Sequence, residues 1–431
     1  MKNIKIENVI LILLLLSTLC SIYVFNQNLN ILFIANILIC ILTCIKSKFS
    51  IFSLKSLLIN YVLVSIAFQY NTGESYGVLE INKYYLYYGK INFLALIYNI
   101  ILYLFVVNTN IVKQEENKMH ENYQISKIST IICCIMAIIF SIIAFPSLKL
   151  TFSSDARFQA LLPGSGWNHV TIIALILVMP KLKSSNIVKM TYVFCISWFL
   201  LHGERVDMIG LLFCCIILFS TRNISNTKLD RTKQYLKYLI IIFVIVFGMV
   251  TIGEIRNKDN NFDLERLSKK ILIQNTAADL GYVYNLSINY VEDYGFLYGK
   301  SYIHYIKELI PFMNSRDSIE FILDDAYGSP GGAFILSEPY MNFGILGILI
   351  FEVCELYLLS IIIKSNKKYA FVLYLFLLST TFRTSWYGLE YIETGIIYIL
   401  PILYVFTNYL NKRKEKYEYK KWFDFNNYSC F

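Results

Sequence analysis

Four arginines stand beside the ends of long apolar stretches, where charged side chains are unusual. They are Arg157, Arg205, Arg256 and Arg383. A guanidinium group is permanently charged and forked, so it can bind two phosphate oxygens at once. As a set, the four arginines predict a site for an anion such as pyrophosphate. Each one alone is also compatible with an ion pair to a neighbouring carboxylate, or with snorkelling of its long side chain toward water.

Two residues near these arginines could act as a general base. Glu204 directly precedes Arg205, and His169 follows a Pro-Gly-Ser-Gly stretch at residues 163–166. A carboxylate or a neutral imidazole at such a position can accept the proton of an attacking hydroxyl. The alternatives are an ordinary tight turn for the glycines and a hydrogen-bonded interfacial histidine for His169.

Glu352 and Glu355 interrupt an apolar run three residues apart, so a helix would place them on one face. A carboxylate at membrane depth is costly, and we expect both side chains to face the bundle interior, protonated or paired. They indicate either a structural pairing or a proton relay of the kind found in transporters.

The composition explains why these polar residues are conspicuous. The chain has 431 residues, of which 56% are hydrophobic and 16% charged, with a formal charge of +9. Soluble domains are nearer about 25% charged and lack apolar runs of membrane-spanning length. These values exclude a soluble enzyme, a nucleic-acid-binding module and a disordered scaffold. None of the ten cysteines has metal-ligand spacing, so we expect no metal site and no disulfide framework.

Hydropathy predicts an all-α polytopic membrane protein with about twelve transmembrane helices. The predicted spans lie near residues 8–25, 29–45, 51–68, 91–107, 128–145, 169–180, 188–202, 207–220, 238–252, 340–363, 369–382 and 394–410. With both termini inside, the cytoplasmic segments carry 25 basic residues and the short outer loops six. Because Lys and Arg resist export, this asymmetry predicts cytoplasmic termini and places the four arginines at the outer face.

One large extracytoplasmic loop separates the ninth and tenth predicted spans. The chain then divides into residues 1–252 with nine spans, the loop at 253–339, residues 340–410 with three spans, and a basic cytoplasmic tail at 411–431. Within the loop, Thr276-Ala-Ala-Asp279 is typical of a capping box that opens a helix. A second helix is expected from Ser301 to Ile310, ended by Pro311.

The start of the tenth span resembles a known family. The stretch Glu338-Pro-Tyr340-Met-Asn342-Phe343-Gly344-Ile-Leu-Gly347 is similar to the E-x-Y-x-N-F-G-x-x-G signature of O-antigen polymerases, the Wzy-type oligosaccharide repeat-unit polymerases. Tyr298-Gly-Lys-Ser-Tyr302 followed by Ile310-Pro311 resembles a stretch of their large periplasmic loop, and Gly203-Glu-Arg205 resembles their Gly-x-Arg pattern. A basic residue that often follows the Ile-Pro pair is replaced here by Phe312-Met313.

The resemblance implies a polymerase of O-antigen, capsule or exopolysaccharide units in the bacterial plasma membrane. Such enzymes transfer a chain from undecaprenyl pyrophosphate to a hydroxyl of the next lipid-linked unit, without metal, nucleotide sugar or other cofactor. It also implies functional roles for Arg205, Glu338, Tyr340 and Asn342. Glu338 is the first candidate for the base, and a capping role is the alternative. Implied partners are the bilayer, the lipid-linked oligosaccharide, a flippase and a chain-length regulator, and nucleic acid is not among them.

Two other functions stay open. A lipid-oligosaccharide flippase or secondary transporter suits the twelve spans and the Glu352/Glu355 pair, although transporters tend to place their charges at the membrane midplane. A ligase that passes finished polymer to another acceptor would share the same chemistry. The sequence does not identify the acceptor, the sugars or the linkage.

Overall fold

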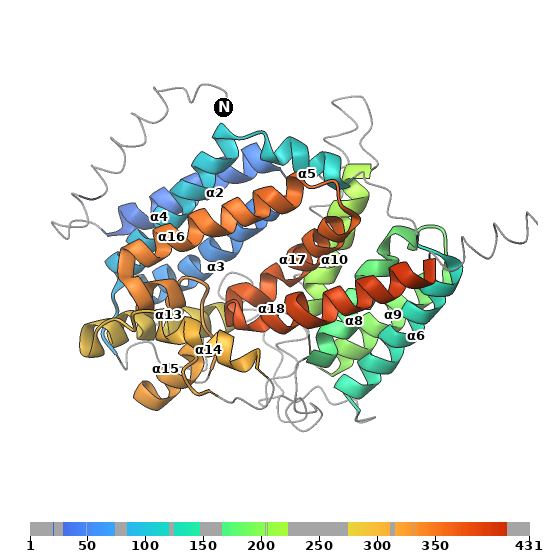
Figure 1. Cartoon of the computed structure of the whole chain (residues 1–431). Helices are drawn as coiled ribbons and strands as arrows, with labels where there is room; N and C mark the ends of the chain where they lie inside the picture. The colour runs from blue at the N-terminus through green and yellow to red at the C-terminus, as the bar shows by residue number, and fades with distance from the viewer. Residues whose placement is uncertain are drawn as a thin grey trace, which may run out of the picture.

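The computed structural model describes Cys20 and residues 29–48, 50–73, 84–119, 125–146, 166–202, 204, 206–222, 275–310, 315–329 and 331–411. Every regular element in this part of the chain is helical (Figure 1). The helices of the first half are α2 (Asn30–Ser47), α3 (Ile51–Thr72), α4 (Tyr88–Asn108), α5 (Ile111–Met119), α6 (Lys127–Ala144), α8 (Gly166–Val178), α9 (Asn186–Leu201) and α10 (Val206–Arg222). Those of the second half are α13 (Asn275–Tyr294), α14 (Lys300–Glu308), α15 (Ile319–Tyr327), α16 (Ser337–Lys364), α17 (Lys368–Tyr387) and α18 (Glu390–Thr394).

The protein is a helical membrane protein. Six of the described helices are long and apolar enough to cross a bilayer, the last of them running from Tyr391 to Asn411, and three shorter apolar helices accompany them. Several helices leave an apolar stripe uncovered, as α2 does with Ile34, Leu38 and Ile45. In a bilayer, lipid tails cover such stripes at no cost.

Ten of the predicted spans coincide with described helices. The spans near 8–25 and 238–252 fall outside the described residues, apart from Cys20, and so does almost all of the tail at 411–431. The count of twelve and the position of the termini therefore stay predictions.

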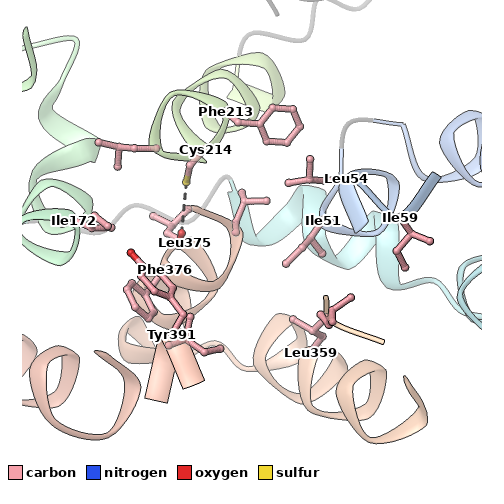
Figure 2. Close-up of a cluster of buried hydrophobic side chains, with 14 of the residues drawn as sticks. Ile51, Leu54, Ile59, Ile172, Phe213, Cys214, Leu359, Leu375, Phe376 and Tyr391 are labelled. Carbon is pink, nitrogen blue, oxygen red and sulfur yellow. Dashed lines mark hydrogen bonds between the residues drawn. The ribbon is translucent and has the colours of Figure 1, made fainter. Parts of the chain in front are cut away.

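Helix α17 lies at the centre of the bundle. It packs against α10, α3, α16 and α8, while α2 and α4 flank α3 on one side and α6 and α9 flank α8 on the other (Figure 1). Figure 2 shows the packing around it, where the Cys214 thiol of α10 donates to the Leu375 carbonyl of α17 at 3.7 Å. A central helix of this kind is well suited to hold a side chain at its end in a fixed position.

The helices of the predicted loop are part of the bundle. Helix α13 begins close to the predicted capping box, and α14 matches the second predicted helix to within two residues. α13 packs against α3 and α16, and its Val283, Leu286 and Ile288 are buried. Helices α13, α14 and α15 gather at the end of the bundle opposite to α5 (Figure 1).

Candidate functional site

Three of the predicted site residues meet in one buried cluster, which we call the arginine cluster. Arg383 lies in the last turn-and-a-half of α17, Glu204 precedes α10, and His169 lies in the first turn of α8. Asp207 of α10 and two tyrosines, Tyr387 and Tyr391, complete it. All six side chains come from helix ends on the side of the bundle that carries α13–α15.

A close approach of two helices brings the charged members together. A Cβ at Gly210 of α10 would lie 1.7 Å from the Ser379 carbonyl oxygen of α17, so only glycine allows this contact. Asp207 lies three residues before Gly210, and Arg383 lies four residues after Ser379. Because residues three and four apart share a helix face, the same contact places the two side chains opposite each other.

Carboxylates lie along two edges of the Arg383 guanidinium group, and tyrosine rings lie near it. Its two terminal nitrogens face the two carboxylate oxygens of Glu204, with Nη1–Oε1 at 3.2 Å and Nη2–Oε2 at 3.3 Å. The Nε atom lies 3.9 Å from Asp207 Oδ1, beyond hydrogen-bonding distance. The guanidinium carbon lies 4.5 Å from the ring centre of Tyr387 and 5.3 Å from that of Tyr391. Buried between rings and carboxylates, the group has a fixed orientation.

Helix α18 supplies the link between Arg383 and His169. The Tyr391 hydroxyl donates to Asp207 Oδ1 at 2.7 Å, and the Tyr391 ring centre lies 4.6 Å from that of His169. Gly395 begins a π-helical turn at the point where the chain passes His169, and a Cβ there would meet the His169 and Phe376 rings. His169 is 1% exposed, and neither ring nitrogen has a hydrogen-bond partner among the described residues. Both nitrogens are also buried in this arrangement.

Glu338 lies in a second group of residues, at the start of α16. Ser301 Oγ of α14 donates to Glu338 Oε1 at 2.6 Å, and the Tyr305 hydroxyl donates to Oε2. Both carboxylate oxygens are thus engaged by one short helix. Burial and the Glu338 carboxylate raise the pKa of the neighbouring Tyr302 hydroxyl above its usual value. This geometry favours the anchoring role of Glu338 over that of a free base.

Asn342 stabilises the same contact between α14 and the start of α16, which we call the Glu338 junction. Its Oδ1 accepts from the Gly299 amide at 2.8 Å, and its Nδ2 donates to Ser301 Oγ at 2.7 Å and to the Glu338 carbonyl at 2.9 Å. Every polar atom of the amide is used. Asn342 therefore orders the turn that leads into α14, and α14 in turn holds the Glu338 carboxylate.

The glycines of the motif permit a kink in α16. Phe343 and Gly344 leave helical geometry, and Gly344 has φ of 62° and ψ of −140°, a conformation essentially restricted to glycine. A Cβ at Gly347 would lie 1.9 Å from the Pro339 carbonyl oxygen. The first turns of α16 can therefore fold back closely on the helix that follows the kink.

Tyr340 belongs to neither group. It is 2% exposed, and the Lys90 ammonium lies 5.3 Å from its ring centre. Lys90 also pairs with Glu292 of α13. Tyr340 therefore joins α16 to α4 near α13.

The two groups adjoin through the backbone. The Ala333 amide donates to the Trp386 carbonyl at 3.0 Å and the Ile335 amide to that of Ser385 at 3.3 Å, so the segment before Glu338 runs along the end of α17. Glu393 of α18 also lies within electrostatic range of Glu338. The Glu338 junction and the arginine cluster thus form two parts of one region.

The remaining predictions fall outside the described residues. Arg157, Arg205 and Arg256 are among the residues that the structure leaves undescribed, so Arg383 is the one of the four arginines whose position it gives, and the four-arginine site stays a prediction. Sequence reasoning missed Asp207, Tyr387 and Tyr391. Asp207 lies three residues beyond Glu204 at the same helix end, and the tyrosines lie four and eight residues beyond Arg383. Spacing from Glu204 and Arg383 was the available signal for Asp207 and Tyr387, whereas Tyr391 lies beyond the end of α17 and had none.

The charge balance of the arginine cluster limits its chemistry. Two carboxylates face one guanidinium among its described members, and Glu204 takes only two of the five N–H donors of Arg383. Within the described ranges, no three His, Cys, Asp or Glu side chains are grouped to hold a metal ion. The cluster offers an oriented cation and an unengaged imidazole, which suits proton transfer beside an anionic group.

No family model, curated protein or solved structure matches this chain.

Proposed function

We propose that the protein polymerises oligosaccharide repeat units carried on undecaprenyl pyrophosphate, at the outer face of the bacterial plasma membrane. The main support for this proposal is that His169, Glu204 and Arg383 lie together beside the Glu338 junction. The sequence predicts the first two as candidate bases and Arg383 as a ligand of pyrophosphate. The motif Glu338–Gly347, by which the chain resembles the O-antigen polymerases, forms that junction. Cytoplasmic termini, a flippase and a chain-length regulator as partners belong to the same proposal.

In the proposed reaction, a sugar hydroxyl attacks the anomeric carbon of the lipid-linked chain. The new bond forms between this oxygen and the anomeric carbon, while the bond from that carbon to the pyrophosphate oxygen breaks. The hydroxyl proton passes to His169, whose ring nitrogens have no partner among the described residues, unlike the engaged carboxylates of Glu204 and Glu338. Pyrophosphate leaves with the electron pair and needs no proton from an acid.

Arg383 stabilises the departing pyrophosphate in this proposal. Glu204 holds the guanidinium in place, and the donors that Glu204 does not use remain for phosphate oxygens. Fixed charges of this kind need no reorganisation when the leaving group develops its charge. Arg205, next to Glu204 in the sequence, is the second candidate for the same task.

Surface polysaccharide length tests the proposal. In cells that lack the native protein, Arg383→Ala and His169→Ala should leave single lipid-linked repeat units and abolish long chains at unchanged protein level. His202→Asn is the matched control, because His202 is also a buried histidine at a helix end, but its Nδ1 is bonded to the Trp198 carbonyl at 2.7 Å. Full-length polymer from Arg383→Ala would contradict the role of Arg383, and full-length polymer from His169→Ala would contradict the base.

One observation favours a transporter instead. Lys55 of α3 pairs with Glu355 inside the bundle, and Glu352, one turn away, is 0% exposed, with no hydrogen bond to either carboxylate oxygen from the residues that the structure describes. Such intramembrane groups are typical of proton-coupled transport. The location of repeat units in cells without the protein separates the two functions: a missing polymerase leaves them outside, and a missing flippase leaves them inside.

A further inference from the structure

Helix α14 has an apolar stripe that nothing in the described structure covers, which we call the isoleucine stripe. It consists of Ile303, Ile306 and Ile310, whose exposed fractions are 53%, 64% and 49%. Ile303 and Ile306, three residues apart, share one face of α14, and Ile310 lies in the turn that directly follows the helix. The opposite face, with Ser301 and His304, is completely buried against the protein. α14 therefore exposes its apolar face and buries the face with Ser301 and His304, the reverse of an amphipathic helix in a soluble domain.

Tyr302, which directly precedes Ile303 in α14, contacts the exposed apolar surface of α16. The Tyr302 ring of α14 stacks on Phe343 with ring centres 6.4 Å apart and an interplanar angle of 22°. Phe343 is 44% exposed, and Leu346, one turn further into the membrane helix, is 65% exposed.

The other end of α14 reaches the last membrane helix. The Tyr398 hydroxyl donates to the Leu309 carbonyl at 2.5 Å. Tyr398 is 42% exposed, and Ile402, one turn further along the same helix, is 64% exposed. α14 thus connects the lipid-facing surfaces of two membrane helices.

Two lysines border the isoleucine stripe on α14. Lys300 and Lys307 both pair with Asp317 at 3.0 Å, and these ion pairs hold the pKa of the Asp317 carboxyl well below its usual range. The helix therefore has charges along one edge, isoleucines on its outward face and an anchored face toward Glu338. This order of groups matches a helix at the boundary between headgroups and acyl chains.

We propose that α14 is an interfacial membrane helix, whose isoleucine stripe inserts into the lipid at the headgroup–acyl boundary. The partner is the bilayer itself, because the stripe joins surfaces that lipid already covers on both α16 and the last helix. Glu338 and Asn342 hold α14 at that depth through Ser301, Tyr305 and the Gly299 amide. The inference goes beyond the proposed polymerase function and depends only on the membrane location of the bundle.

Spin-label accessibility tests this placement. Nitroxides are attached to cysteines at positions 303, 306 and 310 of a variant without native cysteines, reconstituted in liposomes of phosphatidylethanolamine and phosphatidylglycerol. Collision with oxygen, which concentrates in lipid, is compared with collision with a nickel chelate, which stays in water. The ratio at the three positions should match that at Leu346. Asp325, exposed on α15, is the matched aqueous control.

Two results would overturn the proposal. Nickel accessibility at the isoleucine stripe equal to that at Asp325 would place α14 in water, and shielding from both reagents would show that another protein segment covers it. A photoreactive benzophenone side chain at position 306 of the otherwise native chain tests the same lipid contact without removal of the cysteines. It should acquire the mass of a phospholipid on irradiation, whereas crosslinking only to protein or water would contradict the lipid contact.

Discussion

Gly210 of α10 lies against the backbone carbonyl of Ser379 in α17, so closely that a Cβ at this glycine would approach the carbonyl oxygen to 1.7 Å. This contact sets the distance between the helices that carry Asp207 and Arg383. The electrostatic part of the candidate site therefore depends on a residue that has no side chain.

Gly210→Ala is expected to separate α10 from α17 and to destabilise the protein by about 3 kcal/mol, the upper part of the usual range for overpacking. Buried cysteines such as Cys214 allow a direct measurement, because a thiol-reactive dye detects them when the bundle unfolds on heating. Ile209→Ala, at a half-buried neighbour, should lower the unfolding temperature less. An unchanged unfolding temperature in Gly210→Ala would show that the helices can move apart freely.

Glu338→Gln should retain polymer synthesis, whereas Glu338→Ala should lose it. A glutamine can still accept from Ser301 and can donate to the Tyr305 oxygen, so α14 stays anchored, but an amide cannot serve as a general base. Polysaccharide length on gels separates the two variants. If Glu338→Gln abolishes long chains at normal protein level, Glu338 is the base, and its bonds to α14 serve to orient it.

Gly344→Ala should destabilise the protein by about 1–3 kcal/mol, the cost of holding a residue other than glycine in its backbone conformation. The added methyl group would also press on the Phe296 ring at 3.0 Å. Leu346→Ala, in the lipid-facing part of the same helix, is the control and should have little effect. Equal unfolding temperatures for the two variants would mean that the kink is not required for stability.

Glu115 of α5 predicts a dependence of stability on pH. Burial raises the pKa of its carboxyl from 4.5 to about 7, although the Tyr374 hydroxyl and the Ile51 amide both donate to the carboxylate. The folded protein thus binds the proton more tightly than the unfolded chain. The contribution of Glu115 to the free energy of unfolding should be greatest below about pH 4.5. It should fall by about 3 kcal/mol as the pH rises through 7.

Glu115→Gln is the test of this dependence. The neutral amide keeps an acceptor oxygen, so the variant should have a higher unfolding temperature than the native protein at pH 8 and a similar one near pH 4.5. Glu116→Gln is the matched control, since the neighbouring Glu116 forms a surface ion pair with Lys48. A native-like pH profile for Glu115→Gln would show that another group titrates.

The helices could be predicted from sequence because bilayer thickness imposes a length on apolar segments. This is why the predicted spans matched α2, α3, α4 and α6 closely. The burial of α13 could not be predicted, because its polar residues resemble those of a surface helix. Asn285, for example, is 0% exposed because it bonds to the backbone at Tyr85 and Tyr87, far away in the sequence.

The candidate site was predictable only in part for a similar reason. Arg383, Glu204 and His169 stood out because charged and polar groups are rare at these helix ends. Tyr391 gave no such signal, since tyrosines are abundant in this chain and only the fold brings this one to Asp207. The anchoring bonds of Glu338 depend on α14, whose position relative to α16 follows from the turn at Gly299 and not from any periodicity.

The backbone pairing of Ala333 and Ile335 with the end of α17 has a consequence for mutagenesis. Main-chain amides and carbonyls make these bonds, so a side-chain substitution such as Ile335→Ala removes packing but leaves the bonds themselves intact. Proline is the one natural replacement that removes the donor hydrogen. The main chain of this segment therefore aligns the two carboxylate-bearing regions, while its buried side chains fill the space between them.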